Sequence, residues 1–562
     1  MSDDAQLLRD RIVRARSDGR LATLKEYLKL SGPGWLQSAI TLGGGSLAGS
    51  LYLGIIGGYE MMWLQPLMMI FGVVMLSAIA YVALCSGERP FRALNAHVSP
   101  VLGWSWIIAT VMANLVWAMP QFSLGTAAMR QNLGLFTFSG GEYVVALLLF
   151  AVSAAVVWLY DKGGAAFRLF DLLLKLMVAV VVVSFFMVVL TMSVRGDGLP
   201  WSSILGGFIP NPRLIFEPTQ SLQSLVQQSS TPDYWHDMVV SAQRDRMVAA
   251  AATAVGINMT FLMPYSLLKR GWDKEFRGLV RFDLSTGLFI PFLLATSCVV
   301  LAAASQFHAH PEQGLISYER FGGSPQELPE KIVQAYEKNL ADMMSVSGKT
   351  KPLAEIPRPD RILAATLIQR DAFALANSLE QFTGKGTAQV VFGIGVVGMA
   401  ISSIIILMLI NGFALCETLD RPSTGLLYRI GSMAPGVTGA LGALFLWSGK
   451  AKFYLAVPTS KFGMVLLPIA YISFFFMMNN RRLLGDAMPK GMARWAWNIL
   501  MGIGVLLALT GAAISILNDT AQIPGTGIYV KYVAVALVAF LVAVGALIHV
   551  RRIDMSDERE GM

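Results

Sequence analysis

Apolar runs of about 20 residues recur along the whole chain, and they constrain the fold more than any other feature of the sequence. Each run is long enough to cross about 30 Å of hydrocarbon as a helix. The runs fall at residues 35–57, 62–85, 102–129, 141–160, 168–194, 247–268, 282–306, 387–416, 430–448, 462–480, 493–517 and 527–550. The sequence therefore predicts an all-α polytopic membrane protein with about twelve transmembrane helices.

The composition agrees with this class and argues against several functions. Charged residues make up 14% of the 562 residues, whereas soluble proteins carry about a quarter. The three cysteines, Cys85, Cys298 and Cys416, lie in or at the ends of apolar runs, which is typical of small buried side chains. We find no P-loop and no nucleophile–base–acid pattern, so we expect neither an enzyme nor an ATP-driven pump, and no cofactor.

The basic residues predict the orientation in the membrane. Arg89 and Arg92, the segment 269–281 and the segment 481–494 place lysine and arginine in short loops on one side. By the positive-inside rule this side is cytoplasmic, and so are both termini. The net charge of +8 is explained in this way without a nucleic-acid partner. We expect an integral protein of the bacterial inner (plasma) membrane, with the long loops 195–246 and 307–386 outside as ordered caps.

Two of the spans contain helix-breaking residues. Three consecutive glycines interrupt the first span at Gly43–Ser46, and a proline interrupts the sixth at Met263–Pro264. The glycines could be no more than a packing cluster, and the proline no more than a simple kink. Non-helical backbone at membrane depth, however, persists where it is buried in protein or lines a cavity, and breaks at matching places in two halves indicate an inverted-repeat transporter.

The corresponding domain organisation has five parts. We expect a cytoplasmic segment 1–34, a first repeat 35–194, an outer loop 195–246, a second repeat 247–480 that includes the loop 307–386, and two last helices with a tail at 481–562.

Several motifs, in order, resemble the Nramp-type (natural resistance-associated macrophage protein) divalent metal transporter family. They are "GPGWLQSAITLGGGS" (32–46), "MPYS" (263–266), "RFDLSTGLFIPFLLATSCVVLAAA" (281–304), "FALANSLEQFTGKGTAQVVFGIGVVGMAISS" before and within the eighth span, and "NNRRLLGD" (479–486). The resemblance implies the LeuT-type fold, with two inverted five-helix repeats, here followed by two further C-terminal helices, and alternating access.

The departures from the family's motifs fall on its metal site. Counted from the shared GPG, the family's metal-binding aspartate falls on Gly43 and its asparagine on Ser46. The methionine of the sixth span is kept as Met263, but the adjacent histidine becomes Tyr265, and a glutamine of the tenth span falls on Leu466. The third span has no acidic residue. The resemblance therefore implies a divergent member whose usual metal and proton sites are lost.

A glycine-rich break followed by a helix N-terminus favours a carboxylate or a small anion. We therefore predict a secondary transporter of a small neutral or anionic solute in the lipid bilayer, and leave the oligomeric state open. The predicted substrate-binding residues are Gly43, Gly44, Gly45, Ser46, Met263, Tyr265 and Ser266, with Thr41, Asn258, Gln121 and Leu466 around them.

Two alternatives remain open at this point. The first is transport of a divalent cation such as Mn²⁺ or Mg²⁺, bound by carbonyl groups, Met263 and water. The second is a sensor or scaffold that does not transport. Uniport and sodium coupling are both compatible with the missing acids. The sequence assigns no sodium site, although carbonyl groups around the two breaks and hydroxyl groups at Ser402 and Ser403 could contribute to one.

Overall fold

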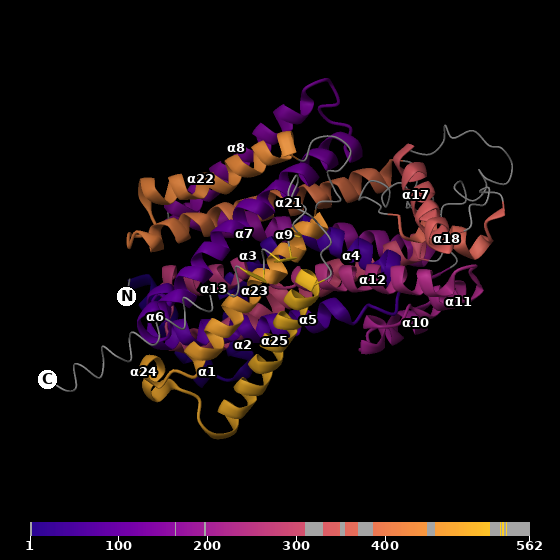
Figure 1. Ribbon diagram of the computed structural model, residues 1–562. Helices are drawn as coiled ribbons and strands as arrows, with labels where there is room; N and C mark the ends of the chain where they lie inside the picture. Colours follow the sequence, from indigo (N-terminus) through magenta and orange to yellow (C-terminus); the bar gives the residue numbers. More distant parts are fainter. Residues whose placement is uncertain are drawn as a thin grey trace.

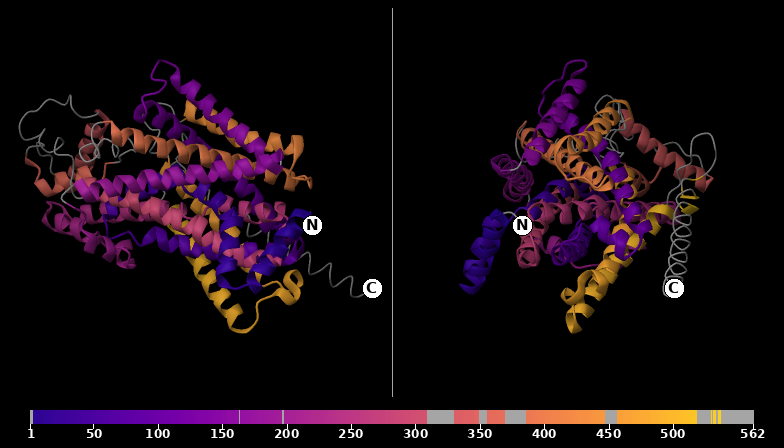
Figure 2. Two further views of the ribbon diagram at one scale, coloured as in Figure 1. Left: turned by 180° about the vertical axis from the view of Figure 1, so that it is seen from behind. Right: turned by 90° about the vertical axis from the view of Figure 1, so that its left-hand side faces the viewer.

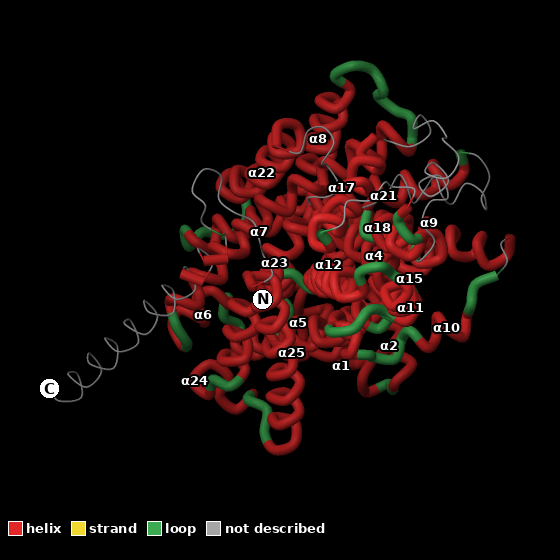
Figure 3. The backbone as a smooth tube through the Cα atoms, turned by 45° about the vertical axis from the view of Figure 1, so that its right-hand side comes forward, coloured by secondary structure: helices red, strands yellow, loops and turns green. Residues whose placement is uncertain are grey.

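The structure is a computed structural model that describes residues 3–162, 164–195, 198–308, 330–348, 355–368, 386–446 and 456–517, with isolated residues 529, 531, 532, 535 and 536. These residues are almost entirely helical (Figure 3). Nine of their helices are long and apolar enough to cross a membrane, and one bent pair brings the number to ten. The predicted all-α polytopic membrane fold is therefore confirmed.

Every predicted span except the last coincides with a helix or a pair of helices. The helices of the first half are α3 (Pro33–Thr41), α4 (Gly44–Gly57), α5 (Leu64–Ser86), α6 (Pro90–His97), α7 (Pro100–Ala127), α8 (Gly141–Lys162) and α9 (Gly164–Arg195). In Figures 1 and 2 most of the long helices run in roughly the same direction. The predicted twelfth span, 527–550, lies outside the described residues apart from a few isolated positions.

The first span is broken, as the glycine run predicts. Pro33 stands in the first turn of α3, where a missing N–H costs nothing, and α3 ends at Thr41. Leu42 and Gly43 are non-helical, and α4 resumes at Gly44 with its axis bent by 57°. Small residues then let α4 pack closely: a methyl group on Gly49 would lie 3.1 Å from the Ala250 Cα atom.

The second half begins with another broken span, but the break is not where the sequence predicts it. The helices are α12 (Pro232–Ala252) and α13 (Ile257–Lys269), with residues 253–256 non-helical between them. Met263 and Pro264 lie inside α13. The prediction of a break at Met263–Pro264 was therefore wrong, because a membrane helix tolerates one internal proline, whereas the chain opens about two turns earlier, at residues 253–256.

The remaining helices complete the bundle. They are α14 (Arg277–Asp283), α15 (Ile290–Phe307), α21 (Thr387–Thr418), α22 (Gly425–Leu441), α23 (Ala456–Met478), α24 (Arg481–Leu484) and α25 (Gly491–Leu517). A π-helical segment, Leu284–Phe289, joins α14 to α15. α21 lies against α3, α7, α9 and α22, so this helix connects the first broken span with the rest of the bundle.

Short helices from the two long loops form a cap at the end of the molecule away from the N-terminus (Figure 1). They are α10 (Trp201–Gly206), α11 (Gln220–Gln228), α17 (Glu330–Ser347) and α18 (Arg358–Thr366). Three of them, α11, α17 and α18, enclose a hydrophobic cluster separate from the main core, together with the first turns of α12. Ile204 of α10 belongs to the main core. Buried Asp360 accepts hydrogen bonds from Trp235 Nε1 (2.7 Å) and from the backbone N–H of Ser230 (3.0 Å), which ties α18 to the start of α12.

The opposite end carries an N-terminal hairpin of α1 (Asp3–Ser17) and α2 (Arg20–Leu30). Ion pairs join it to the segment before α14: Arg16 to Glu275 at 3.0 Å and Arg9 to Asp273 at 3.4 Å. These pairs are partly exposed and contribute modestly to stability.

Candidate functional site

A small cavity lies where the two broken spans meet. Its volume is about 20 Å³, which is room for one water molecule or one monatomic ion. Four segments line it: the break between α3 and α4, the middle of α7, the break between α12 and α13, and the start of α23. The lining residues are Ile40, Thr41, Gly43, Gly45, Ser46, Trp117, Pro120, Gln121, Thr253, Met259, Thr459 and Ser460.

Hydrogen bonds at the first break use backbone groups that the helix ends leave free. The N–H of Gly44 donates to Oε1 of Gln121 at 2.8 Å, and the Ser46 hydroxyl donates to the carbonyl of Thr41. Gly43, Gly45, Ser46, Thr41 and Gln121 were all singled out from the sequence, and the structure brings them together at the cavity.

Gly43 stands where the resembling family has its metal-binding acid, and another side chain fills the space beside it. A methyl group built on Gly43 would overlap the hydroxyl of Ser403 on α21, and would lie 3.3 Å from Gln121 Oε1. Nothing in the local sequence signals this contact, since Ser403 belongs to a helix far along the chain. The Ser403 hydroxyl thus lies beside Gly43, where an aspartate side chain would begin.

The three residues predicted from the "MPYS" motif do not reach the cavity. Met263, Tyr265 and Ser266 are buried in α13, about two to three turns beyond the break. The Tyr265 hydroxyl accepts the N–H of Phe91 at 3.3 Å, and the Ser266 hydroxyl donates to the Met263 carbonyl at 2.8 Å. The structure therefore does not support their assignment as cavity residues, because the helix breaks earlier than the motif suggested.

Two of the predicted surrounding residues also lie off the cavity lining. Leu466 is partly buried on α23 and packs against the hydrophobic core. Asn258 is fully buried, and its Oδ1 accepts the N–H of Met259 at 2.9 Å, while its Nδ2 has no hydrogen-bond partner among the described residues.

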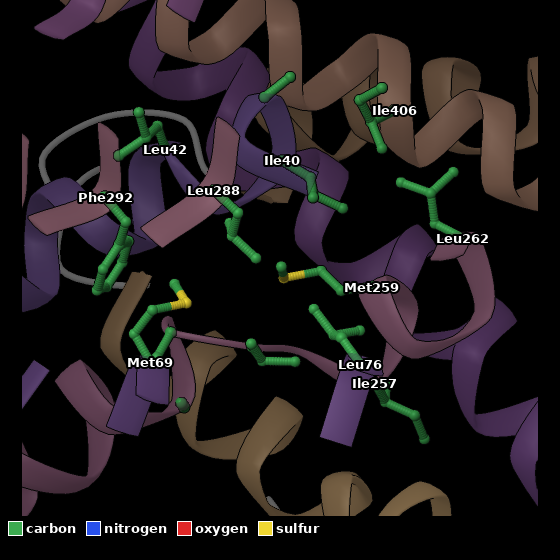
Figure 4. Close-up of a cluster of buried hydrophobic side chains, with 14 of the residues drawn as sticks. Ile40, Leu42, Met69, Leu76, Ile257, Met259, Leu262, Leu288, Phe292 and Ile406 are labelled. Carbon is green, nitrogen blue, oxygen red and sulfur yellow. The ribbon is translucent and has the colours of Figure 1, made fainter. Parts of the chain in front are cut away.

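Sequence reasoning missed Met259, which lies directly after the second break. Its sulfur accepts a hydrogen bond from the Thr41 hydroxyl at 3.0 Å, so it joins the two breaks. In Figure 4 its thioether extends toward the middle of a group of buried apolar side chains that includes Ile40 and Leu288. The available signal was Gly256, three residues before it, which is a weaker helix breaker than three glycines or a proline.

Trp117 on α7 closes one side of the cavity. Its ring covers Gly256, on which a methyl group would lie 3.0 Å from the ring, and its Nε1 donates to the carbonyl of Thr459 at 2.9 Å. The Trp117 side chain thus contacts both the second break and α23. The sequence offered no reason to choose Trp117 among twelve tryptophans.

No acidic residue lines the cavity within the described residues, and no cluster of three metal-binding His, Cys, Asp or Glu side chains occurs among them. The nearest charges in sequence are two turns from the second break or directly beside Ser460. Arg246 lies 4.8 Å above the ring of Tyr52, and Lys461 pairs with Asp245 at 2.8 Å. None of these three charged side chains lines the cavity.

Asp283 holds the other end of the first half-helix. This buried side chain at the end of α14 accepts the N–H of Gly34 at 2.6 Å, the N–H of Gly32 at 3.2 Å and the hydroxyl of Ser31. A carboxylate at a helix N-terminus satisfies free N–H groups and interacts favourably with the helix dipole. α3 is thus fixed at its beginning by Asp283 and at its end by the contacts of the break.

Comparisons with known proteins agree with this architecture. The profile of the family described as "Natural resistance-associated macrophage protein-like" (Nramp) matches residues 34–323, slightly more than half of the chain. Manganese transporter pdt1 of Schizosaccharomyces pombe is 23% identical over 188 residues, which span 34% of this chain and 35% of the yeast protein.

Solved structures give the same result over a longer stretch. The crystal structure of the Eremococcus coleocola manganese transporter, in complex with an aromatic bis-isothiourea substituted compound, is similar with a TM-score of 0.62 at 14% identity. The similarity covers 94% of this chain and 96% of that one. A mutant of the same transporter matches at 13% identity with the same coverage and TM-score. The predicted LeuT-type fold class is confirmed.

Proposed function

The chain belongs to the natural resistance-associated macrophage protein-like (Nramp) family, and from that premise we propose that it is a secondary transporter whose substrate is a divalent metal cation. The two similar proteins described above are manganese transporters, which supports this substrate class. A divalent metal cation is thus preferred as substrate over a neutral or anionic solute. The sequence alone favoured the neutral or anionic solute.

The observation that carries the proposal is the meeting of Met259, Thr41 and Gln121 around a cavity for one ion. A thioether suits softer divalent metals, while hydroxyl, amide and backbone carbonyl oxygens suit Mn²⁺. The described lining holds no carboxylate, so the cation would keep part of its water shell and draw on the carbonyl ends of the broken helices for negative charge.

Alternating access follows from the two halves of the fold. We assign residues 35–194 and 247–480 as the two repeats, which rock against each other around the cavity at their breaks. The basic loops favour a cytoplasmic location for the N-terminal hairpin and Asp283. The cap of α10, α11, α17 and α18 then lies outside, where it covers the outer half of α12.

A small anion is the second candidate, and a specific observation favours it. Arg246 stands two turns before the second break, and Lys461 directly follows the lining residue Ser460 and pairs with Asp245 at 2.8 Å. The N–H groups of the first turn of α4 also point to this region, because α4 begins at the cavity. A cavity of about 20 Å³ would admit a monatomic anion but not an organic carboxylate in this conformation.

Influx of Mn²⁺ into proteoliposomes, read by a metal-sensitive dye inside, tests the proposal. Met259→Ala is compared with Met263→Ala, a matched control on the same helix that is equally buried but does not line the cavity. Both substitutions remove a buried methionine at a cost of about 2–5 kcal/mol, so folding is checked for both. We expect the apparent affinity for Mn²⁺ to fall by about tenfold or more in Met259→Ala alone.

Two results would contradict this assignment. Equal losses in both variants would show that Met259 acts through packing and not as a ligand. No saturable influx above that of empty liposomes, with folded protein, would rule out Mn²⁺ as substrate, and chloride influx in the same vesicles would then test the second candidate.

A further inference from the structure

The N-terminal hairpin carries a stripe of exposed leucines on its second helix, α2. Leu21, Leu24 and Leu28 are 82%, 44% and 60% exposed. Their spacings of three and four residues place them on one face of the helix. Apolar side chains gathered in this way mark a surface that binds a membrane or a protein partner. We call these three residues the leucine stripe.

Basic side chains border the leucine stripe on both edges. By the helical repeat of 3.6 residues, Arg20 lies at one edge and Lys25 at the other. Neither forms an ion pair among the described residues. Glu26, the single acid of α2, lies on the opposite face, where Arg11 and Lys29 pair with it at 2.7 and 3.0 Å. An apolar stripe between free cations suits an interface of hydrocarbon and anionic headgroups.

A hollow with a volume of about 350 Å³ opens beside the leucine stripe. Arg20 and Leu24 belong to its lining, so a polar hollow and an apolar strip adjoin each other. Arg16 Nη1 lies 3.0 Å from a carboxylate oxygen of Glu275, so the charge of Arg16 is shared, whereas that of Arg20 is not. No acidic residue belongs to the described lining, which consists of Arg16, Gly19, Arg20, Thr23, Leu24 and Tyr27.

Contacts on the other side of α2 hold this surface in shape. The Thr23 hydroxyl lies 3.0 Å from the carbonyl oxygen of Ala15, which is buried together with Ile12 between the two helices of the hairpin. The ring of Tyr27 packs on that of Phe282 in α14, with 5.6 Å between the ring centroids. The hollow and the leucine stripe are therefore preformed, and a ligand would not have to order them.

The hairpin lies where the first membrane span begins. Only Ser31 and Gly32 separate the end of α2 from the first residue of α3. In the right-hand view of Figure 2, which looks along most of the long helices, the indigo N-terminal helices run across that direction and extend to one side of the bundle. A short helix that runs across the end of a membrane bundle lies along the membrane surface. α2 is therefore placed where acyl chains and headgroups meet.

We propose that the hollow and the leucine stripe form a binding surface for an anionic phospholipid of the membrane leaflet at this end of the protein. The headgroup phosphate lies in the hollow against Arg20 and the Tyr27 hydroxyl, and the acyl chains lie along Leu24 and Leu28. This surface is independent of the substrate proposed above, since none of its residues lines the substrate cavity.

The test is native mass spectrometry of the purified full-length protein, titrated in detergent with dioleoylphosphatidylglycerol or dioleoylphosphatidylcholine. We expect tighter retention of phosphatidylglycerol, because basic residues at the membrane surface attract anionic lipids. Arg20→Gln should weaken this retention by about fivefold. Arg14→Gln is the matched control, since it removes the same charge from an exposed position on α1 outside the hollow, and it should leave the retention unchanged. Inorganic phosphate at the same concentration should not displace the lipid.

A second variant tests the apolar part of the surface and does not depend on the folding of Arg20→Gln. Leu21→Gln and Leu28→Gln are combined, because both side chains are exposed and the helix does not need them for packing. In lipid nanodiscs that contain phosphatidylglycerol, the peptide 20–30 should lose its protection from hydrogen exchange in this double variant.

Three results would overturn the proposal. Equal retention of the two lipids, or equal losses in Arg20→Gln and Arg14→Gln, would show that charge acts diffusely and that no headgroup site exists. Displacement by inorganic phosphate would show that the hollow binds free phosphate. Protection of the peptide 20–30 that rises with protein concentration, and not with phosphatidylglycerol, would assign the leucine stripe to a second copy of the chain.

Discussion

Replacing Gly43 with alanine tests whether the Ser403 hydroxyl occupies the space that a side chain at position 43 needs. The added methyl group would overlap this hydroxyl, and would lie 3.1 Å from the carbonyl oxygen of Ile40 and 3.3 Å from Gln121 Oε1. Gly43 has φ −119° and ψ −174°, a conformation open to alanine, so the cost is steric and not conformational.

The magnitude follows from which atoms must move. Overpacking a tight interior destabilises a protein by about 1–3 kcal/mol. In a Ser403→Ala background the overlapping hydroxyl is gone, and the nearest remaining atoms are oxygens at 3.1 and 3.3 Å, which need to shift by only a few tenths of an ångström. We therefore expect the two substitutions to be non-additive, with a coupling of about 1–2 kcal/mol in favour of the double variant.

The assay is a double-mutant cycle on equilibrium unfolding in mixed detergent micelles. Gly45→Ala is the control, because its methyl group would meet Thr253 Cγ2 at 3.4 Å and Ser460 Oγ at 3.5 Å, which are ordinary contacts. Alanine in the first turn of α4 favours the helix by up to about 1 kcal/mol, so Gly45→Ala should not destabilise the protein. Additivity of Gly43→Ala and Ser403→Ala within about 0.5 kcal/mol would refute the reasoning.

Two further predictions concern the ends of the molecule. Asp283→Ala should free the N–H groups of Gly32 and Gly34, and because a helix cap contributes about 0.5–2 kcal/mol, their hydrogen exchange should speed up by about 2- to 30-fold. The exchange is measured by mass spectrometry on the peptide 31–41, and unchanged exchange would show that α3 does not depend on this carboxylate. Asp360→Ala should leave Trp235 Nε1 buried without its acceptor and destabilise the cap by about 1–3 kcal/mol. Limited proteolysis should then cut the segment 199–231 faster while the membrane helices stay protected, and equal cleavage of both regions would argue against a separate cap.

Much of the fold could be predicted from the sequence, because the bilayer leaves few choices. An apolar run of sufficient length in hydrocarbon has to satisfy its own backbone groups, and a helix does so within the segment. For the same reason the glycine run at 43–45 predicted the first break to within a residue or two. The family motifs added the LeuT-type fold, which the structural comparison supports over 94% of the chain.

The second break could not be located in this way. Pro264 is the stronger local helix breaker, yet α13 continues through it, while the chain opens at 253–256 with a single glycine. The difference lies in tertiary contacts: Trp117 covers Gly256, and the sulfur of Met259 accepts the hydroxyl of Thr41. Such contacts satisfy or shield backbone that local propensity alone would keep helical.

The sequence by itself therefore determined that this is a helical membrane protein with a glycine-rich break in its first span and no acid at position 43. Only the tertiary structure decided what stands there instead. It brings Gln121, Met259 and Ser403 to the break from three other helices, and places Ser402 and Ser403 on the free carbonyls of α3. These are contacts between segments far apart in the chain, whose meeting depends on how whole helices pack and not on the residues beside them.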